Sequence, residues 1–329
     1  MKKNIGKILA AVLCMSCLLT GCRIGNKDVV ISTTLNDRQV FRIADTSCGL
    51  KEAKVYLVNY QNIYGTAYGI NLWDHDFGEI SLETYVKDIT IEELTRVVCM
   101  DLLAEEREIT LTEEETAKVA EAANAYYQTL TDEEISYMGV SVHDIEEYYQ
   151  HYALAQKLYH ILTSEVNNEV SDDEARVMEI MQIYVSNASD AGVVEQKLAS
   201  GEDFASVANN YNELSNIQVM VSRDDLPDEV EEVAFQLDDN EISGKIATEN
   251  GYYFIRCINK YNQELTEANK VNIVEKREKE AFDDVYNAFV STLSSVINEE
   301  LWQELEMDTE SQIQTNNFFE VFQTYCGDI

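Results

Sequence analysis

Apolar residues recur every three or four positions from Leu50 to about residue 165, which is the period of amphipathic helices. In residues 82–103 the apolar side chains predicted to share one helical face are Leu82, Tyr85, Val86, Ile89, Leu94, Val97 and Val98. A further helix is predicted over residues 142–165. Residues 28–47 are β-branched and mixed, which predicts one or two short strands before the helices.

Polar residues at a fixed spacing mark where several of the helices begin. In a capping box, a Ser or Thr side chain accepts a hydrogen bond from the backbone N–H three residues later. The side chain of a Glu at that later position accepts a hydrogen bond from the backbone N–H of the Ser or Thr. Pairs with this spacing predict helix starts at Thr112 with Glu115, at Thr131 with Glu134, and at Ser171 with Glu174.

A mixed pattern interrupts the helical one between residues 172 and 262. It predicts a strand at 177–185, two short helices at 193–211 broken at Gly201, a helix at 228–237, and two strands at 241–258 around a turn at Asn250 and Gly251. From Leu265 to about Met307 the helical period returns and predicts one long amphipathic helix. The pattern therefore predicts an α+β chain, mostly helical, into which a small α/β domain is inserted.

The domain boundaries follow from these changes of period, because Pro occurs only once and Pro-rich linkers are absent. The final segment is polar apart from one aromatic cluster and matches neither period. The expected divisions are an export signal at 1–21, a helical domain at 22–171, the mixed domain at 172–262, a C-terminal helix at 263–307 that packs on the helical domain, and a tail at 308–329.

The first 22 residues have the layout of a bacterial lipoprotein signal. Lys2, Lys3 and Lys7 precede a short apolar run, and the sequence LTGC ends at Cys22. Such a run is too short to span a bilayer and is typical of an export signal. We expect cleavage before Cys22, lipidation of its sulfur and anchoring at the extracytoplasmic face of the cell membrane. An ordinary secretory signal with an incidental cysteine is the alternative.

The composition narrows the range of partners. A formal net charge of −37 excludes nucleic acid and anionic lipid as partners, because both require a basic surface. It favours partners that are basic or locally cationic. Of the seven cysteines, Cys48, Cys99, Cys257 and Cys326 lie beyond Cys22, without a CxxC motif and with no pairing assigned.

The histidines do not converge on a metal site, and we expect neither a metal nor another cofactor. His143, His151 and His160 share one predicted helix at spacings that do not bring them together, and His75 lies in a polar loop.

Two segments of the mixed domain resemble the parvulin peptidyl-prolyl isomerases. They are LASGEDFASVANNYNE (198–213) and DDLPDEVEEVAFQLDDNEISGKIATENGYYFI (224–255), and their order and spacing match those of the family. A parvulin block flanked by helical sequence is similar to the exported foldases of the PrsA and SurA type. The resemblance implies a chaperone of unfolded exported proteins that carries a parvulin-like domain.

The resemblance also assigns positions to the site. Its catalytic positions fall on Gln182, Tyr253 and Glu213, and its substrate pocket falls on Leu226, Val230 and Phe235. The family carries histidines at the first two of these positions. Gln182 and Tyr253 can still hydrogen-bond to each other. The family's Gly-Gly-x-Leu-Gly segment is absent after Glu213. These departures predict a binding domain with weak or absent isomerase activity.

Three functions compete at this point. The first is a membrane-anchored foldase or chaperone, in which helical tyrosines contact clients or simply pack: Tyr126, Tyr127, Tyr148, Tyr149, Tyr152 and Tyr159. The second is an active peptidyl-prolyl isomerase with unusual site residues. The third is the solute-binding lipoprotein of a transporter, which would need repeated βαβ units where this chain has one α/β block. Whether the helical part closes as a homodimer stays open.

Overall fold

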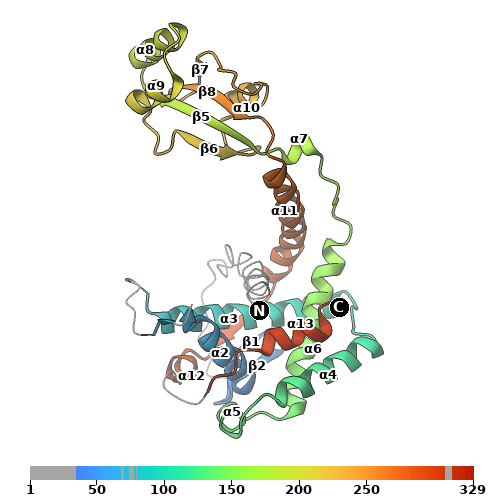
Figure 1. The fold of residues 1–329 in the computed structure, drawn as a ribbon. Coiled ribbons are helices and arrows are strands. Elements are labelled where there is room, and N and C mark those ends of the chain that lie inside the picture. The colour runs from blue at the N-terminus through green and yellow to red at the C-terminus, as the bar shows by residue number, and fades with distance from the viewer. Residues whose placement is uncertain (1–34, 68–69, 74–77, 79, 308–312) are drawn as a thin grey trace. The chain divides into compact units, whose positions relative to one another are not determined.

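The computed structural model of the chain describes residues 35–67, 70–73, 78, 80–307 and 313–329 (Figure 1). The predicted export signal, Cys22 and His75 lie outside these ranges. The chain divides into two compact units, one formed by Met1–Ser164 with Ala281–Ile329 and the other by Glu165–Glu280. The second unit contains the whole of the predicted mixed domain, 172–262.

The first unit is mostly helical around one apolar core. Its helices are α2 (Leu50–Tyr64), α3 (Leu82–Glu106), α4 (Glu113–Tyr127), α5 (Asp132–Met138), α6 (Val142–Thr163), α12 (Glu299–Glu304) and α13 (Phe318–Cys326). Thr112 and Thr131 cap α4 and α5 with both hydrogen bonds of the capping box, as the sequence predicts. The apolar face predicted for residues 82–103 is largely confirmed, since Val86, Ile89, Leu94, Val97 and Val98 of α3 are buried.

A small antiparallel sheet joins the two sequence segments of the first unit. Strands β1 (Gln39–Ile43) and β2 (Thr46–Gly49) are the short strands expected before the helices, and β9 (Ser295–Ile297) pairs with β1. The order is β2-β1-β9, with Phe41 opposite Ile297. A separate pair is formed by β3 (Thr66–Ala67) and β4 (Ile70–Asn71).

The prediction of one helix from Leu265 to Met307 is wrong. Helix α11 (Gln263–Val290) ends where hydroxyl side chains compete for the backbone: Ser291 donates to the carbonyl oxygen of Ala288 (2.7 Å) and Thr292 to that of Phe289 (2.7 Å). Strand β9 follows, and Asn298 then caps α12 by accepting from the Leu301 N–H (3.2 Å).

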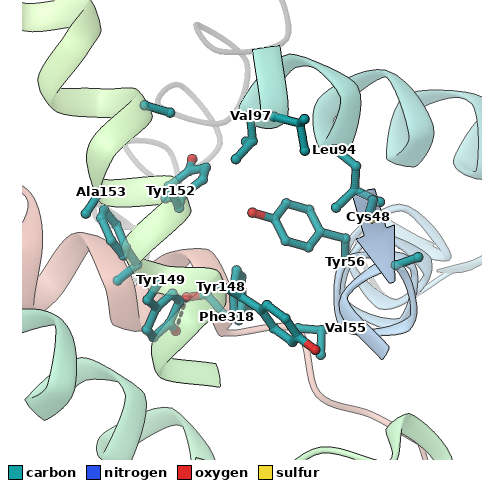
Figure 2. Close-up of a cluster of buried hydrophobic side chains, with 14 of the residues drawn as sticks. Cys48, Val55, Tyr56, Leu94, Val97, Tyr148, Tyr149, Tyr152, Ala153 and Phe318 are labelled. Carbon is teal, nitrogen blue, oxygen red and sulfur yellow. Dashed lines mark hydrogen bonds between the residues drawn. The ribbon is translucent and has the colours of Figure 1, made fainter. Parts of the chain in front are cut away.

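Most of the helical tyrosines belong to the core. Tyr126, Tyr148, Tyr149 and Tyr152 are buried, so they pack inside the unit and offer no free surface to a client. Figure 2 shows three of them together with Tyr56 of α2 and Phe318 of α13. The packing explanation of these tyrosines is therefore the one that holds for these four.

The second unit is a four-stranded antiparallel sheet with helices on both faces (Figure 1). Its strands are β5 (Met178–Val185), β6 (Gln218–Val221), β7 (Ile246–Ala247) and β8 (Tyr252–Asn259), in the order β6-β5-β8-β7. Its helices are α7 (Asp172–Ala175), α8 (Ala188–Ala199), α9 (Phe204–Tyr211), α10 (Asp228–Ala234) and the first part of α11. Strand β6 is absent from the sequence prediction, whereas the other strands and helices match predicted segments, except that α8 begins at Ala188, before the predicted start at residue 193.

The α+β class expected from the sequence is confirmed, with mostly helical structure and small antiparallel sheets. Among the described residues, no helix is both long enough and apolar enough to cross a bilayer. Cys48, Cys257 and Cys326 are buried free thiols.

Candidate functional site

The pairing of β5 with β8 decides which side chains share a face of the sheet. Side chains alternate along a strand, so residues that stand opposite each other in the register point to the same side. Gln182 stands opposite Ile255, and Tyr184 stands opposite Tyr253. These four residues therefore share one face, which also carries Ile180 and Cys257. We call it the α10 face, because the core on this side includes Val230 and Ala234 of α10.

The opposite face carries a separate core. Ile183 and Val185 of β5 and Phe254 of β8 pack there with Val194 of α8 and Phe204 of α9, and all five are buried. The sheet is thus covered by apolar side chains on both sides, and only partly buried residues can meet a ligand.

Gln182 is buried and fastened to the loop before β6. Its side-chain Nε2 donates to the carbonyl oxygen of Asn216 (3.1 Å), and its backbone N–H donates to that of Ile217 (2.7 Å). The hydrogen bond that these side chain types allow between Gln182 and Tyr253 is not formed in the structure. The register explains this, because Tyr253 is the partner of Tyr184 and only a diagonal neighbour of Gln182.

Tyr253 forms an aromatic pair with Tyr184. The ring centroids are 4.9 Å apart and the rings are tilted by 49°. The Tyr184 hydroxyl donates to the carbonyl oxygen of Asn250 (2.7 Å), which holds this ring over the β7–β8 turn. Burial raises the pKa of Tyr253, and the nearby Tyr184 adds to the rise. Because both effects raise the pKa, the Tyr253 phenol stays protonated at neutral pH.

Close packing around this pair explains the glycine in the turn. A Cβ at Gly251 would lie 2.6 Å from the carbonyl oxygen of Val185 and 2.7 Å from a ring carbon of Tyr184. Any larger residue would therefore displace the aromatic pair. The sequence suggested only a turn at this glycine.

The three pocket positions lie at different depths of the α10 face. Val230 is fully buried, and Phe235 is only 6% exposed. Leu226 and Tyr253 are half-buried and pack against the same apolar cluster. Leu226 and Tyr253, together with the partly buried Val219 and Val233, are therefore apolar residues of this face that a peptide can touch, while Val230 is fully buried.

Two arginines cover the ring of Phe235. The guanidinium carbons of Arg223 and Arg176 lie 4.1 and 4.8 Å from the ring centroid, close enough for cation–π attraction. Arg176 Nη2 also donates to the Phe235 carbonyl oxygen (2.9 Å), and Asp173 bridges the two guanidinium groups. Sequence reasoning missed these arginines, since nothing in their spacing links them to Phe235.

Glu213 lies at the end of β5. Its Oε1 accepts hydrogen bonds from the backbone N–H (3.1 Å) and the hydroxyl (3.2 Å) of Ser186, and its own N–H donates to the Tyr184 carbonyl oxygen (3.0 Å). The carboxylate is thus held just beyond the strand, where it fixes the chain after β5. Gln182 and Glu213 therefore do not share a hydrogen-bond partner, because the Gln182 side chain donates to Asn216 and the Glu213 side chain accepts from Ser186.

The α10 face has little capacity for proton transfer near neutral pH. Burial raises the pKa of its thiol, Cys257, to about 11, with a further rise from Asp239. The Gln182 amide does not titrate in this range. The histidines that the structure describes, His143, His151 and His160, lie on α6 in the first unit. Among the described residues no cluster of side chains could hold a metal ion.

Comparison with known families decides what this arrangement is. Residues 140–271 match the model of the PPIC-type PPIase domain. The chain contains a parvulin domain. The resemblance seen in residues 198–213 and 224–255 is confirmed at this level.

Proteins that match more than half of the chain share only low sequence identity with it. The chain is 26% identical over 219 residues to the foldase protein PrsA of Clostridium acetobutylicum, a match that covers 57% of this chain and 62% of that protein. It is 24% identical over 231 residues to PrsA of Caldanaerobacter subterraneus, covering 62% and 70%. The match thus spans less than two thirds of the length of the first of these relatives.

Similar solved structures include foldases and a small parvulin. PrsA from Bacillus cereus matches with 19% identity and a TM-score of 0.39, covering 80% of this chain and 99% of that one. NmPin, the parvulin of Nitrosopumilus maritimus, matches with 28% identity and a TM-score of 0.23, covering 25% of this chain and 95% of that one.

Substitution of the turn glycine tests the packing of the parvulin domain. We predict that Gly251→Ala destabilises this unit by about 1–3 kcal/mol, because the added methyl group has no room beside Tyr184 and Val185. Native-state hydrogen exchange of the β5 and β8 amides measures the change.

A second glycine gives a control of opposite sign. Gly192 lies inside α8 with nothing within 4 Å of an added Cβ, so Gly192→Ala should stabilise the unit by about 0.5–1 kcal/mol. Equal protection in Gly251→Ala and the unchanged protein would contradict the described packing.

Proposed function

We propose that the protein is a membrane-anchored, extracytoplasmic foldase that binds unfolded exported proteins, and that its parvulin domain acts as a binding surface with weak or absent peptidyl-prolyl isomerase activity. The match to a parvulin domain and the similarity to proteins named PrsA foldases support the client class. The observation that carries the proposal is the α10 face, which bears the uncharged side chains of Gln182 and Tyr253 at the positions where the resemblance expects histidines.

Isomerisation of an X-Pro bond requires a twisted amide to be bound more tightly than either planar isomer. The barrier arises because twisting breaks amide resonance. A site that accelerates this step needs groups aimed at the twisted amide. In this protein the Gln182 amide donates to Asn216, and the ring of Phe235 is covered by Arg176 and Arg223. Because these groups already bind other parts of the protein and are not aimed at a twisted amide, they favour binding of a prolyl segment over catalysis.

Binding is supported by the half-buried side chains of the same face. Leu226 and Tyr253 offer apolar contact area, and Tyr184 supports the ring of Tyr253 from beside it. The net charge of −37 attracts clients that carry Lys or Arg near apolar residues. Such attraction is screened over about 8 Å at physiological salt, so affinity should fall as salt rises.

The first test measures client affinity of surface variants. We predict that Leu226→Ser and Tyr253→Ser each weaken binding of a fluorescent unfolded peptide that combines apolar residues, Lys and Pro by about fivefold, because each removes about 1 kcal/mol of apolar contact. Fluorescence anisotropy on the purified protein gives the dissociation constants, expected in the micromolar range.

Val193→Ser is the matched control, because Val193 is an exposed apolar residue of α8, outside the core of the α10 face. Affinities that stay unchanged in Leu226→Ser and Tyr253→Ser would argue against this surface, as would an equal loss in Val193→Ser. Tighter binding at higher salt would argue against the role of charge.

The second test concerns the anchor. We predict that Cys22→Ala blocks lipidation and leaves an unprocessed precursor or a released protein, because the thiol that takes the lipid is gone. Fractionation of the producing cells followed by mass measurement shows where the protein lies and whether residues 1–21 have been removed. A variant that stays in the membrane fraction at its mature size would refute the anchor.

A further inference from the structure

The described part of the predicted tail, residues 313–329 and called the tail from here on, is held in the first unit largely by side chains of four helices. The side chains that receive the tail come from α2, α4, α5 and α6 and are called the tail site: Tyr56, Asn59, Tyr126, Glu134, Tyr149 and Tyr152. All six are buried. Neither the period analysis nor the parvulin resemblance assigns a role to this segment.

Several side chains bind the backbone of the tail. Glu134 Oε1 accepts from the N–H groups of Gln314 (2.8 Å) and Thr315 (2.7 Å). Asn59 Oδ1 accepts from the Phe318 N–H (3.1 Å), and the Tyr149 hydroxyl donates to the Phe318 carbonyl oxygen (2.6 Å; Figure 2). Every residue except Pro offers these backbone groups, so this part of the recognition does not depend on the sequence of the bound segment.

The polar groups of the site are also held by hydrogen bonds to residues outside the tail. Asn59 Nδ2 donates to the carbonyl oxygen of Val55 (2.9 Å) and to the hydroxyl of Tyr126 (2.9 Å), which orients its Oδ1 toward Phe318. Glu134 Oε2 accepts from Thr131 in the capping box, which leaves Oε1 for the tail. Such preorganisation is expected of a binding site, because it lowers the entropy lost when a ligand binds.

Aromatic contacts supply the selective part of the recognition. The ring of Phe318 lies 4.4 Å from that of Tyr149 and 5.2 Å from that of Tyr126, and Phe322 lies 4.8 Å from Tyr152. These centroid distances lie at the short end of the range of favourable aromatic pairs, which begins at about 4.5 Å. The Thr315 hydroxyl also contacts the Tyr126 hydroxyl (3.2 Å).

The tail does not satisfy every polar group around it. The Tyr56 ring packs against Phe318 at 5.4 Å, yet its hydroxyl is buried without a hydrogen-bond partner among the described residues. A bound segment with a polar side chain at this point would give the Tyr56 hydroxyl a hydrogen-bond partner that the tail does not supply.

We propose that the tail site is a peptide-binding site that holds the tail as an intramolecular ligand and that also accepts unfolded client segments of the same chemistry. That chemistry is a Ser or Thr followed three residues later by an aromatic residue, with a second aromatic residue four positions further on, as in Thr315, Phe318 and Phe322. The proposal rests on the proposed function for the nature of the client, an unfolded chain.

The covalent link makes the tail a strong competitor. A tethered ligand has an effective concentration in about the millimolar range, so a free peptide binds well only when the tail is weakened or the client is already held nearby. The tail then keeps this aromatic site covered in the absence of client, which prevents exposure of a large apolar surface.

The test uses the full-length protein and a fluorescent synthetic peptide of residues 313–329. Phe318→Ala weakens the tail without changing the site, so the peptide should bind this variant at least tenfold more tightly than the unchanged protein. Tyr325→Ala is the matched control, because Tyr325 lies on α13 and is 40% exposed; it should bind the peptide as weakly as the unchanged protein does. A peptide that itself carries Phe318→Ala should bind at least tenfold more weakly.

Equal peptide affinity for folded Phe318→Ala and the unchanged protein would overturn the proposal. If Phe318→Ala does not fold, hydrogen exchange of the unchanged protein decides. The amides of residues 322–326 should exchange at least tenfold faster than those of residues 119–126 in α4, because the tail detaches by itself. Equal exchange in the two segments would show that the tail is a permanent part of the core.

Client assays separate this inference from the proposed function. If Phe318→Ala binds the peptide but neither protein suppresses aggregation of an unfolded client, the tail site stands as a peptide site and the foldase proposal fails. If the unchanged protein suppresses aggregation but Phe318→Ala gains no peptide binding, the foldase proposal stands and the tail site fails.

Discussion

The pairing of β5 with β8 is the constraint on which the parvulin domain depends. Its register places Tyr253 beside Tyr184 and Gln182 beside Ile255, and it sends Ile183 and Phe254 to the other core. A slip of one residue would exchange the two faces, because side chains alternate along each strand. The approach of Gly251 to Val185 and Tyr184 fixes the end of this pairing. The site is thus a consequence of register and of one tight turn.

Once the register is set, the chemistry of the α10 face follows from what each polar group already binds. The Gln182 side-chain amide donates a hydrogen bond to the Asn216 carbonyl oxygen, and the Glu213 carboxylate accepts one from Ser186. The Cys257 thiol and the Tyr253 phenol both have a raised pKa, chiefly because burial disfavours their charged forms. What remains for a partner is a half-buried apolar surface that includes Leu226 and Tyr253. A fold can be retained for such a surface without its original chemistry.

Local signals in the sequence were sufficient for much of the fold. The capping boxes at Thr112 and Thr131 predicted two helix starts, because the interacting groups are only three residues apart. Long-range pairing escaped the same reasoning. The period after Leu265 gave no sign that β9 would pair with β1, about 250 residues earlier in the chain, although the hydroxyl-rich run at Ser291 and Thr292 was a usable stop signal. Strand β6 was missed because four residues are too few to establish a period.

The candidate site shows the same division between position and environment. Spacing against the family motif assigned Gln182, Tyr253 and Leu226 as candidate site positions. Their surroundings depend on contacts between distant segments, such as Arg176 against Phe235, and no pattern in one sequence contains these. Tyr184 could have been found, because it lies two residues after Gln182 and must therefore share its face.

Exchange NMR on a short Ala-Pro peptide is the most direct test of the central claim, that the α10 face binds prolyl segments without accelerating their isomerisation. One sample reports both properties, because binding shifts resonances of Tyr253 and Leu226 while catalysis adds exchange cross-peaks between the cis and trans peptide. We predict that these resonances shift as peptide is added and that the exchange rate stays within about twofold of the uncatalysed rate, which corresponds to tens to hundreds of seconds. Exchange that accelerates in proportion to protein concentration, and that is lost in Tyr253→Ala, would contradict the account and make Tyr253 a catalytic residue.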